Sequence, residues 1–302
     1  MADTETATVT ADSGWSGPAT VPGSAGRVSI AIAFCLLSMS SVQFGAALSK
    51  PAMQSLGAFG ATWLRVSWAA AFLLLLVRPR FFSYTRSQWL TALSLGATMA
   101  TMTLCFFAAI ERIPLGLGVA IEFLGPLTVA AIFGGRGWRL LFPAIAAAGV
   151  LCLSWDGSAW VADARGLLFA FGAAIGWGGY IVLMKHAGQS FRGLEGLAVS
   201  LLFAALVATP FGVHQVQSGL SFDLLLVTAG LAVLVPLLPY ALEFMALRRM
   251  QPSAFGILMS LEPAIGACAG FIVLGQVLSL HQIFGVALVM LASAAGTVLA
   301  KA

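Results

Sequence analysis

Apolar residues occur in long blocks along most of the chain, separated by short polar stretches. A helix needs about 20 mostly apolar residues to cross the hydrocarbon core of a bilayer. Ten blocks approach or exceed this length: 28–48, 58–78, 88–110, 114–134, 139–156, 166–185, 194–212, 222–246, 253–274 and 281–300. Because backbone groups in lipid must be hydrogen-bonded within the protein, each block predicts an α-helix. The pattern predicts an all-α integral membrane protein with ten transmembrane helices.

The chain also resembles itself. Residues 112–126 read RIPLGLGVAIEFLGP and residues 249–263 read RMQPSAFGILMSLEP, so that Arg, Leu and Pro recur at a constant offset of 137 residues. An internal repeat of this kind outranks local signals when architecture is read from sequence. We therefore expect two halves built on one plan.

Each half contains five of the predicted helices, over residues 28–156 and 166–300. An odd number of spans inserts the second half upside down relative to the first, which predicts an inverted repeat of the kind found in transporters. Residues 1–27 are small, polar and slightly acidic, so we expect a disordered cytoplasmic N-terminus.

Composition and charge agree with a membrane location. The chain is 60% hydrophobic and 9% charged, against about 25% charged residues in a soluble domain. We place the chain in the inner membrane with both termini in the cytoplasm. Most Lys and Arg residues then lie on the cytoplasmic side, as the positive-inside rule requires. Only Lys50, Arg112 and Arg165 fall outside. The net charge of +4 thus indicates topology, and no basic face predicts nucleic-acid binding.

Four ionisable residues lie inside predicted helices: Arg65, Glu122, Glu243 and Glu262. A charge at the bilayer centre costs about 2.5–3.5 kcal/mol on insertion scales, so each is a functional candidate. Glu243 could instead extend to the cytoplasmic surface. Arg65 could pair with a glutamate, in a purely structural ion pair, or meet a substrate.

Glu122 lies about eight residues into its helix, about 12 Å along the axis. Gly118 and Gly125 share its helix face and Pro126 follows, so a backbone or substrate can approach closely. Burial makes such a carboxyl costly to ionise, which suits a proton carrier. The alternative is a glutamate that only holds the structure together.

Glu262 stands directly before Pro263. Proline removes a backbone donor and weakens the turn that holds the acid, which suits a broken or kinked helix beside a cavity. Under the repeat offset Gly125 corresponds to Glu262, so the two acids lie about one turn apart in equivalent helices. We expect them to face a common central cavity, unless Glu262 too is only structural.

Two aromatic residues and a proline are further candidates. Tyr240 shares a helix face with Glu243, and Pro239 interrupts that helix. Trp177 is flanked by glycines in mid-helix, which allows it to line a cavity or to pack in the bundle.

No enzyme, cofactor or metal signature is present. The chain lacks the glycine-rich phosphate loop, the dinucleotide fingerprint, the serine elbow and the zinc-binding His-Glu pattern. Cysteine and histidine show no metal-ligand spacing. The pairs Gly172/Gly176 and Gly266/Gly270 predict close helix packing within the bundle or, alternatively, the seam of a homodimer.

Four segments carry a resemblance to the drug/metabolite transporter superfamily, EamA type, and within it to the threonine/homoserine exporters. They are residues 63–65 (WLR), 113–116 (IPLG) with 120–126 (AIEFLGP), 238–243 (LPYALE) and 255–263 (FGILMSLEP). At 274–276 the chain has Leu-Gly-Gln where such proteins commonly have Leu-Gly-Glu, and we expect a modest effect on gating.

The resemblance implies export of a small neutral amino acid, coupled to inward proton movement, with two halves that alternately open a central cavity. Glu122 and Glu262 would then bind the substrate ammonium or the proton, and Arg65 the substrate carboxylate. Two alternatives stay open: another solute on the same fold, such as a drug cation, a purine or a nucleotide sugar, and an uncoupled channel-like or regulatory membrane protein.

Overall fold

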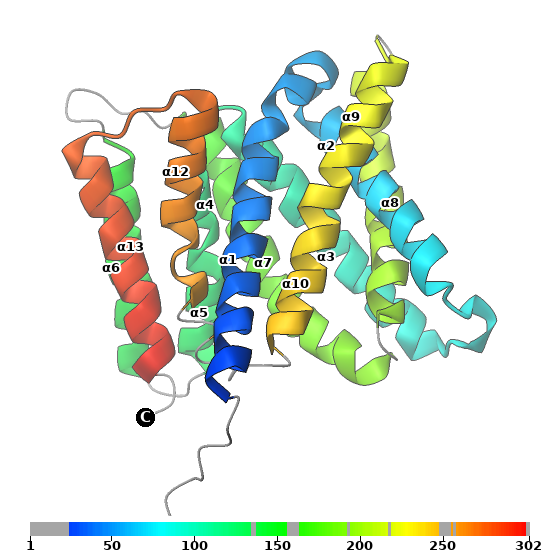
Figure 1. The fold of residues 1–302 in the computed structure, drawn as a ribbon, viewed down its shortest axis with the longest axis horizontal. Helices are drawn as coiled ribbons and strands as arrows, with labels where there is room; N and C mark the ends of the chain where they lie inside the picture. Colours follow the sequence, from blue (N-terminus) through cyan, green and yellow to red (C-terminus); the bar gives the residue numbers. More distant parts are fainter. Residues whose placement is uncertain are drawn as a thin grey trace, which may run out of the picture.

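A computed structural model describes residues 24–133, 137–155, 163–191, 194–216, 219–247, 255 and 258–299. The described residues form helices joined by short turns, without a β-strand (Figure 1). Among the described residues, six helical stretches are long and apolar enough to cross a membrane, with 222–243 counted as one, and four apolar helices are shorter. Large apolar side chains such as Leu75, Ile175 and Leu280 are exposed on the outside, as expected of a surface that contacts lipid.

The helices of the first half are α1 (Ser24–Leu48), α2 (Lys50–Val77), α3 (Arg86–Ile110), α4 (Leu115–Glu122), α5 (Leu124–Phe133) and α6 (Leu141–Leu153). Short 3₁₀ turns cover Phe81–Ser83 and Gly137–Leu140. The start of α1 lies before the expected residue 28, and residues 1–23 of the expected tail lie outside the described residues. Within α2, Gly57 has a φ of 72°, so the expected span from residue 58 begins just after this break.

The second half contains α7 (Ala164–Ser190), α8 (Glu195–Val216), α9 (Phe222–Ala232), α10 (Leu238–Leu247), α12 (Glu262–Leu274) and α13 (Leu280–Leu299). A π-helical turn, Val233–Leu237, joins α9 to α10 and contains the non-helical Val235 followed by Pro236. The span expected over residues 222–246 is therefore bent.

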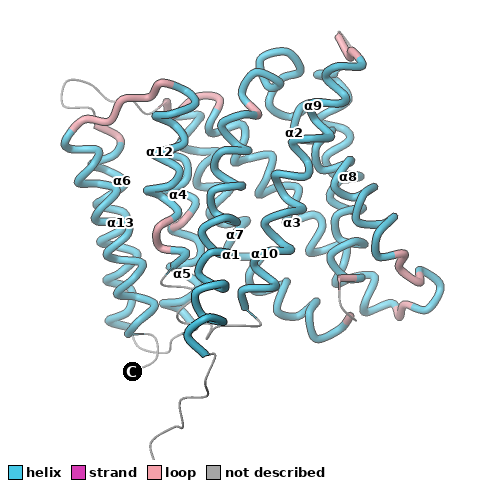
Figure 2. The backbone as a smooth tube through the Cα atoms, viewed as in Figure 1, coloured by secondary structure: helices cyan, strands magenta, loops and turns pink. Residues whose placement is uncertain are grey.

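Two expected spans are interrupted at equivalent positions. The span over 114–134 is divided at Phe123 into α4 and α5, and the span over 253–274 contains a turn at Ser260 and Leu261 before α12 (Figure 2). Phe123 and Ser260 are separated by the repeat offset of 137 residues. Because proline lacks an N–H and fits the first turn of a helix, Pro126 and Pro263 favour a new helix at each place.

Contacts between the halves follow a regular scheme. Two pairs join equivalent elements, namely α2 with α8 and α6 with α13. Three further contacts each have a counterpart under the repeat: α3 with α7 matches α1 with α10, α3 with α8 matches α2 with α9, and α5 with α7 matches α1 with α12. The described ends of α1 and α13 lie on the same side of the bundle (Figure 1).

Small residues allow the close approaches. On α6 and α13, Gly149 and Gly285 meet so closely that a Cβ on either would lie within 2.7 Å of the other's carbonyl oxygen. Gly176 faces Met102 of α3 and Gly270 faces Gln276. Both Gly-xxx-Gly pairs therefore pack inside the chain, as the first of the two interpretations expected, and a homodimer seam would have to use other residues.

Candidate functional site

A cavity of about 450 Å³ lies in the middle of the bundle. Its volume falls within the range of small-molecule sites, about 300–1,000 Å³. Most of its wall is apolar, with side chains such as Met99, Met102, Phe106 and Phe107. Its polar lining residues are Arg65, Thr103, Glu122, Tyr180, Tyr240, Glu243, Glu262 and Ser293. The four ionisable residues expected inside the membrane thus line one cavity.

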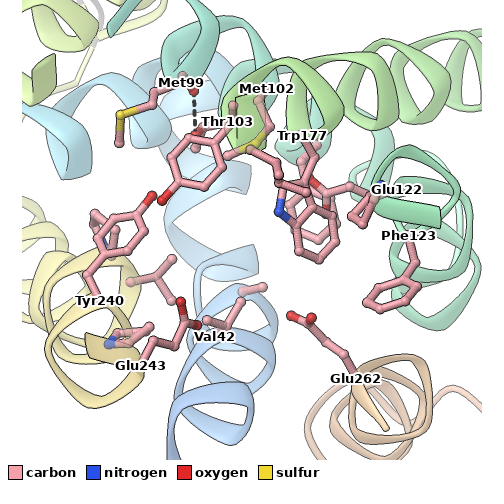
Figure 3. A pocket seen from close by; sticks show the side chains of 18 of the residues that line it. Val42, Met99, Met102, Thr103, Glu122, Phe123, Trp177, Tyr240, Glu243 and Glu262 are labelled. Carbon is pink, nitrogen blue, oxygen red and sulfur yellow. Dashed lines mark hydrogen bonds between the residues drawn. The ribbon is translucent and has the colours of Figure 1, made fainter. Parts of the chain in front are cut away.

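Glu262 is the first residue of α12 and is 5% exposed. Its side chain points toward the centre of the cavity (Figure 3). Its Oε1 accepts a hydrogen bond from Gln43 Nε2 of α1 at 3.1 Å. The free backbone amides at the start of a helix favour negative charge, which offsets part of the cost of burying this carboxyl.

Glu122 is the last residue of α4 and is half-buried in the cavity wall (Figure 3). The free carbonyls at the end of a helix disfavour negative charge. A cation or a proton at Glu122 would offset both this effect and the burial of the carboxyl.

Glu243 on α10 also points into the cavity (Figure 3) and accepts a hydrogen bond from Ser38 Oγ at 2.9 Å. It therefore does not extend to the cytoplasmic surface, which was the alternative expectation, because the hydrogen bond holds it inside the bundle. Tyr240 lies one turn before it, with its ring 6.3 Å from the Tyr180 ring of α7. The carboxyl and the two phenols form one side of the cavity.

Arg65 on α2 is 2% exposed and lines the cavity. Its Nη1 donates to Ser49 Oγ at 2.9 Å, and its guanidinium lies 3.7 Å from the centre of the Phe107 ring. Within the described residues no carboxylate lies within 4.0 Å of it, and Nε and Nη2 have no hydrogen-bond partner. The expected ion pair between Arg65 and a glutamate is therefore wrong for this structure, because the hydroxyl of Ser49 and the face of Phe107 hold the guanidinium instead.

The remaining candidates divide into two groups. Trp177, Pro126 and Pro239 line the cavity, and the Trp177 ring meets Phe123 edge-on at 5.4 Å. Gly118, Gly125 and Pro263 do not line it. Gly118 lies against Ile110 and Gly125 against the Ala174 carbonyl of α7, while Pro263 is buried behind Glu262 at the start of α12. These three therefore shape the breaks and the packing rather than the wall.

Sequence reasoning missed the neutral residues that hold the charged ones. Ser38 and Gln43 on α1 are 0% and 2% exposed, and Ser49 is 2% exposed. Gln43 is an amide within an apolar block, and a buried amide needs partners. That signal was present in the sequence and would have identified it.

Apolar helices around an internal cavity with convergent charges define a membrane transporter. Residues 164–296 match the EamA-like transporter family. The chain is 35% identical over 283 residues to the threonine/homoserine exporter RhtA of Salmonella typhimurium strain LT2, and 33% identical to that of Escherichia coli strain K12. Each match covers 92% of this chain and 95% of the relative. The chain belongs to the EamA-like transporter family, and it is a transporter rather than an enzyme.

A solved crystal structure shares the fold. It superposes with a TM-score of 0.60 at 19% sequence identity, over 92% of this chain and 98% of that chain. At this sequence identity the similarity supports the arrangement of the helices and does not indicate a function.

Proposed function

We propose that the protein exports small neutral amino acids of the threonine and homoserine class across the inner membrane, in exchange for protons. The matches to threonine/homoserine exporters extend over nearly the whole length of this chain and of each relative. The charges of the cavity match an amino acid, which carries one carboxylate and one ammonium group.

The hydrogen-bond donors of Arg65 that lack partners among the described residues are the main observation in support of this proposal. The edge formed by Nε and Nη2 has two donors without partners in the described part of the chain, on a buried side chain that lines the cavity. A guanidinium edge of this kind binds a carboxylate through two parallel hydrogen bonds. An exported amino acid would supply that carboxylate, and its ammonium would turn toward the glutamates.

Glu122 and Glu262 then bind the ammonium group or a proton in alternation. Glu122, at the carbonyl end of α4, most needs a positive partner, so it is the ligand of the ammonium. Glu262, supported by the amide end of α12 and by Gln43, is the group that releases and regains a proton. Glu243, held by Ser38, adds negative charge on the far side.

The inverted repeat provides a basis for alternating access. Ten helices in two inverted halves, with both termini cytoplasmic, would rock about the cavity and open it to one side at a time. The contact pairs that recur between the halves and the interruptions at Phe123 and Ser260 support this arrangement. So does the excess of Lys and Arg on the predicted cytoplasmic side.

The test is counterflow of labelled threonine and homoserine in proteoliposomes that contain the purified protein. We expect exchange that small neutral amino acids inhibit and that threoninol, which lacks the carboxylate, does not. Inhibition by threoninol or by drug cations instead would contradict amino-acid recognition through Arg65 and favour another solute.

Arg65→Lys is the matched variant, since it keeps the positive charge but loses the planar edge. We expect the affinity for threonine to fall by about tenfold to a hundredfold, which corresponds to the loss of a charge-assisted hydrogen bond. An unchanged affinity in Arg65→Lys would show that the edge does not bind substrate.

A further inference from the structure

Helix α1 supplies neutral hydrogen-bond donors to two of the cavity carboxyls. Ser38 donates to Glu243 at 2.9 Å and Gln43 donates to Glu262 at 3.1 Å. Both donors are almost fully buried. Gln43 does not line the cavity, so it contacts Glu262 from behind and leaves the cavity side of the carboxyl free.

The pair formed by Gln43 and Glu262 is incompletely hydrogen-bonded. Gln43 Oε1 and Glu262 Oε2 are buried and have no partner in the described part of the chain. Gly266, one turn along α12, provides the space for the amide, because a Cβ there would lie 3.3 Å from Gln43 Oε1. Two acceptor oxygens without a donor remain at this one contact.

A proton on the carboxyl would supply a missing donor. A carboxylate only accepts hydrogen bonds, whereas a carboxylic acid also donates one, and an amide offers donors on one side and an acceptor on the other. In the present orientation the amide donates to ionised Glu262. Turned by half a rotation, the same amide accepts from protonated Glu262.

We propose that Gln43 is a positioning residue that hydrogen-bonds Glu262 in both protonation states and thereby sets the pH at which Glu262 exchanges its proton. The proposal rests on the proposed function in that Glu262 is the proton carrier. The amide does not titrate itself, so it holds the contact between α1 and α12 in both states.

Other groups also act on Glu262. Glu122 faces it from α4 and Glu243 from α10, and Arg65 lines the same cavity from α2. Cys35 of α1 packs in the cluster beside the start of α12. The contribution of Gln43 is separable from theirs because it acts through one short contact.

Infrared spectroscopy of the purified full-length protein tests the proposal. The absorption of protonated Glu262 is identified as the carboxyl band that Glu262→Gln removes, and it is titrated in the wild type and in Gln43→Met. We expect the midpoint to move upward by about one pH unit in Gln43→Met, since the hydrogen bond lost from the ionised carboxylate is stronger than the neutral one lost from the protonated acid. Gln43→Asn, which keeps a shorter amide, should move it in the same direction by less.

Gln282→Met is the control. Gln282 is 4% exposed on α13, and its amide donates to the Leu153 carbonyl at 3.2 Å, outside the cavity. It should leave the midpoint unchanged. A Gln43→Met midpoint equal to that of the wild type would overturn the proposal, because a purely structural glutamine affects stability alone.

Transport measurements separate this proposal from the proposed function. If the wild type exchanges no amino acid but the Gln43→Met midpoint moves, the proposed function fails and the role of Gln43 stands. If the wild type couples export to protons and the midpoint does not move, the role of Gln43 fails alone.

Discussion

The two interrupted helices resemble each other in backbone and differ in where the acid lies. In the first half Glu122 ends α4, directly before the break at Phe123. In the second half Glu262 begins α12, directly after the turn at Ser260 and Leu261. The repeat offset pairs Glu122 with Met259, and Gly125 with Glu262.

This difference gives one residue type two electrostatic settings. Glu262 stands at the amide end of α12 and accepts a hydrogen bond from Gln43, whereas Glu122 stands at the carbonyl end of α4. A repeated backbone can therefore hold two acids with different tasks. We propose that Glu262 exchanges the proton and that Glu122 binds the ammonium group of the substrate.

The largest effect is expected from Glu262→Gln. Without the proton carrier, export driven by a pH gradient should fall by more than tenfold, while counterflow of threonine at equal pH persists. Uptake into proteoliposomes with and without an imposed gradient measures both. Gradient-driven export at the wild-type rate would remove Glu262 from the coupling step.

Glu122→Gln should act on affinity instead. Losing the charged partner of the ammonium group should weaken threonine binding by about tenfold to a hundredfold, while the response to a pH gradient persists at saturating substrate. The concentration dependence of counterflow measures this change. If Glu122→Gln abolishes coupling and leaves affinity intact, the two roles are reversed.

Gly125→Ala tests why the first break carries glycine where the second carries an acid. A Cβ at Gly125 would meet the Ala174 carbonyl of α7, whereas one at Gly118 would meet side-chain atoms of Ile110 and Phe106, which can move. We expect Gly125→Ala to lower the free energy of unfolding by about 1–3 kcal/mol. Thermal unfolding in detergent should show a smaller loss for Gly118→Ala, and equal losses would contradict the packing argument.

The smallest effect is expected at a contact between the halves that lies away from both breaks. Tyr84 donates a hydrogen bond to Glu195 at 2.9 Å. Burial, together with the hydrogen bond and the negative charge of Glu195, raises the pKa of Tyr84 to about 12. Since this lies above the ordinary value of 10.0, the contact contributes fully below pH 10 and is lost as the pH rises through about 12.

Tyr84→Phe should therefore cost less than about 1 kcal/mol, and the cost should be constant between pH 6 and about 9, well below the titration of Tyr84. Unfolding at several pH values measures it. A cost that grows at neutral pH would contradict this assignment.

Much of this arrangement follows from the pattern of the sequence. Apolar blocks give the helices, and Pro126 and Pro263 indicate where two of them break. The convergence of the acids follows from the cost of burying charge. The break at Gly57 depends on a φ of 72°, which the pattern of apolar residues does not contain.

Partners across the fold were harder to predict. Arg65 is held by Ser49, 16 residues earlier, in a stretch between two predicted helices. Gln43 and Glu262 are 219 residues apart, so their contact exists only once α1 packs on α12. Burying a neutral polar residue in a membrane costs less free energy than burying a charged one. A prediction that starts from buried charges therefore does not select these residues.

The most direct test of the central claim is to record proton movement and threonine movement together in proteoliposomes. With no gradient imposed, an outward flux of threonine should draw protons in the opposite direction in the wild type, and Glu262→Gln should abolish this proton flux. Threonine flux without proton movement in the wild type would contradict the account.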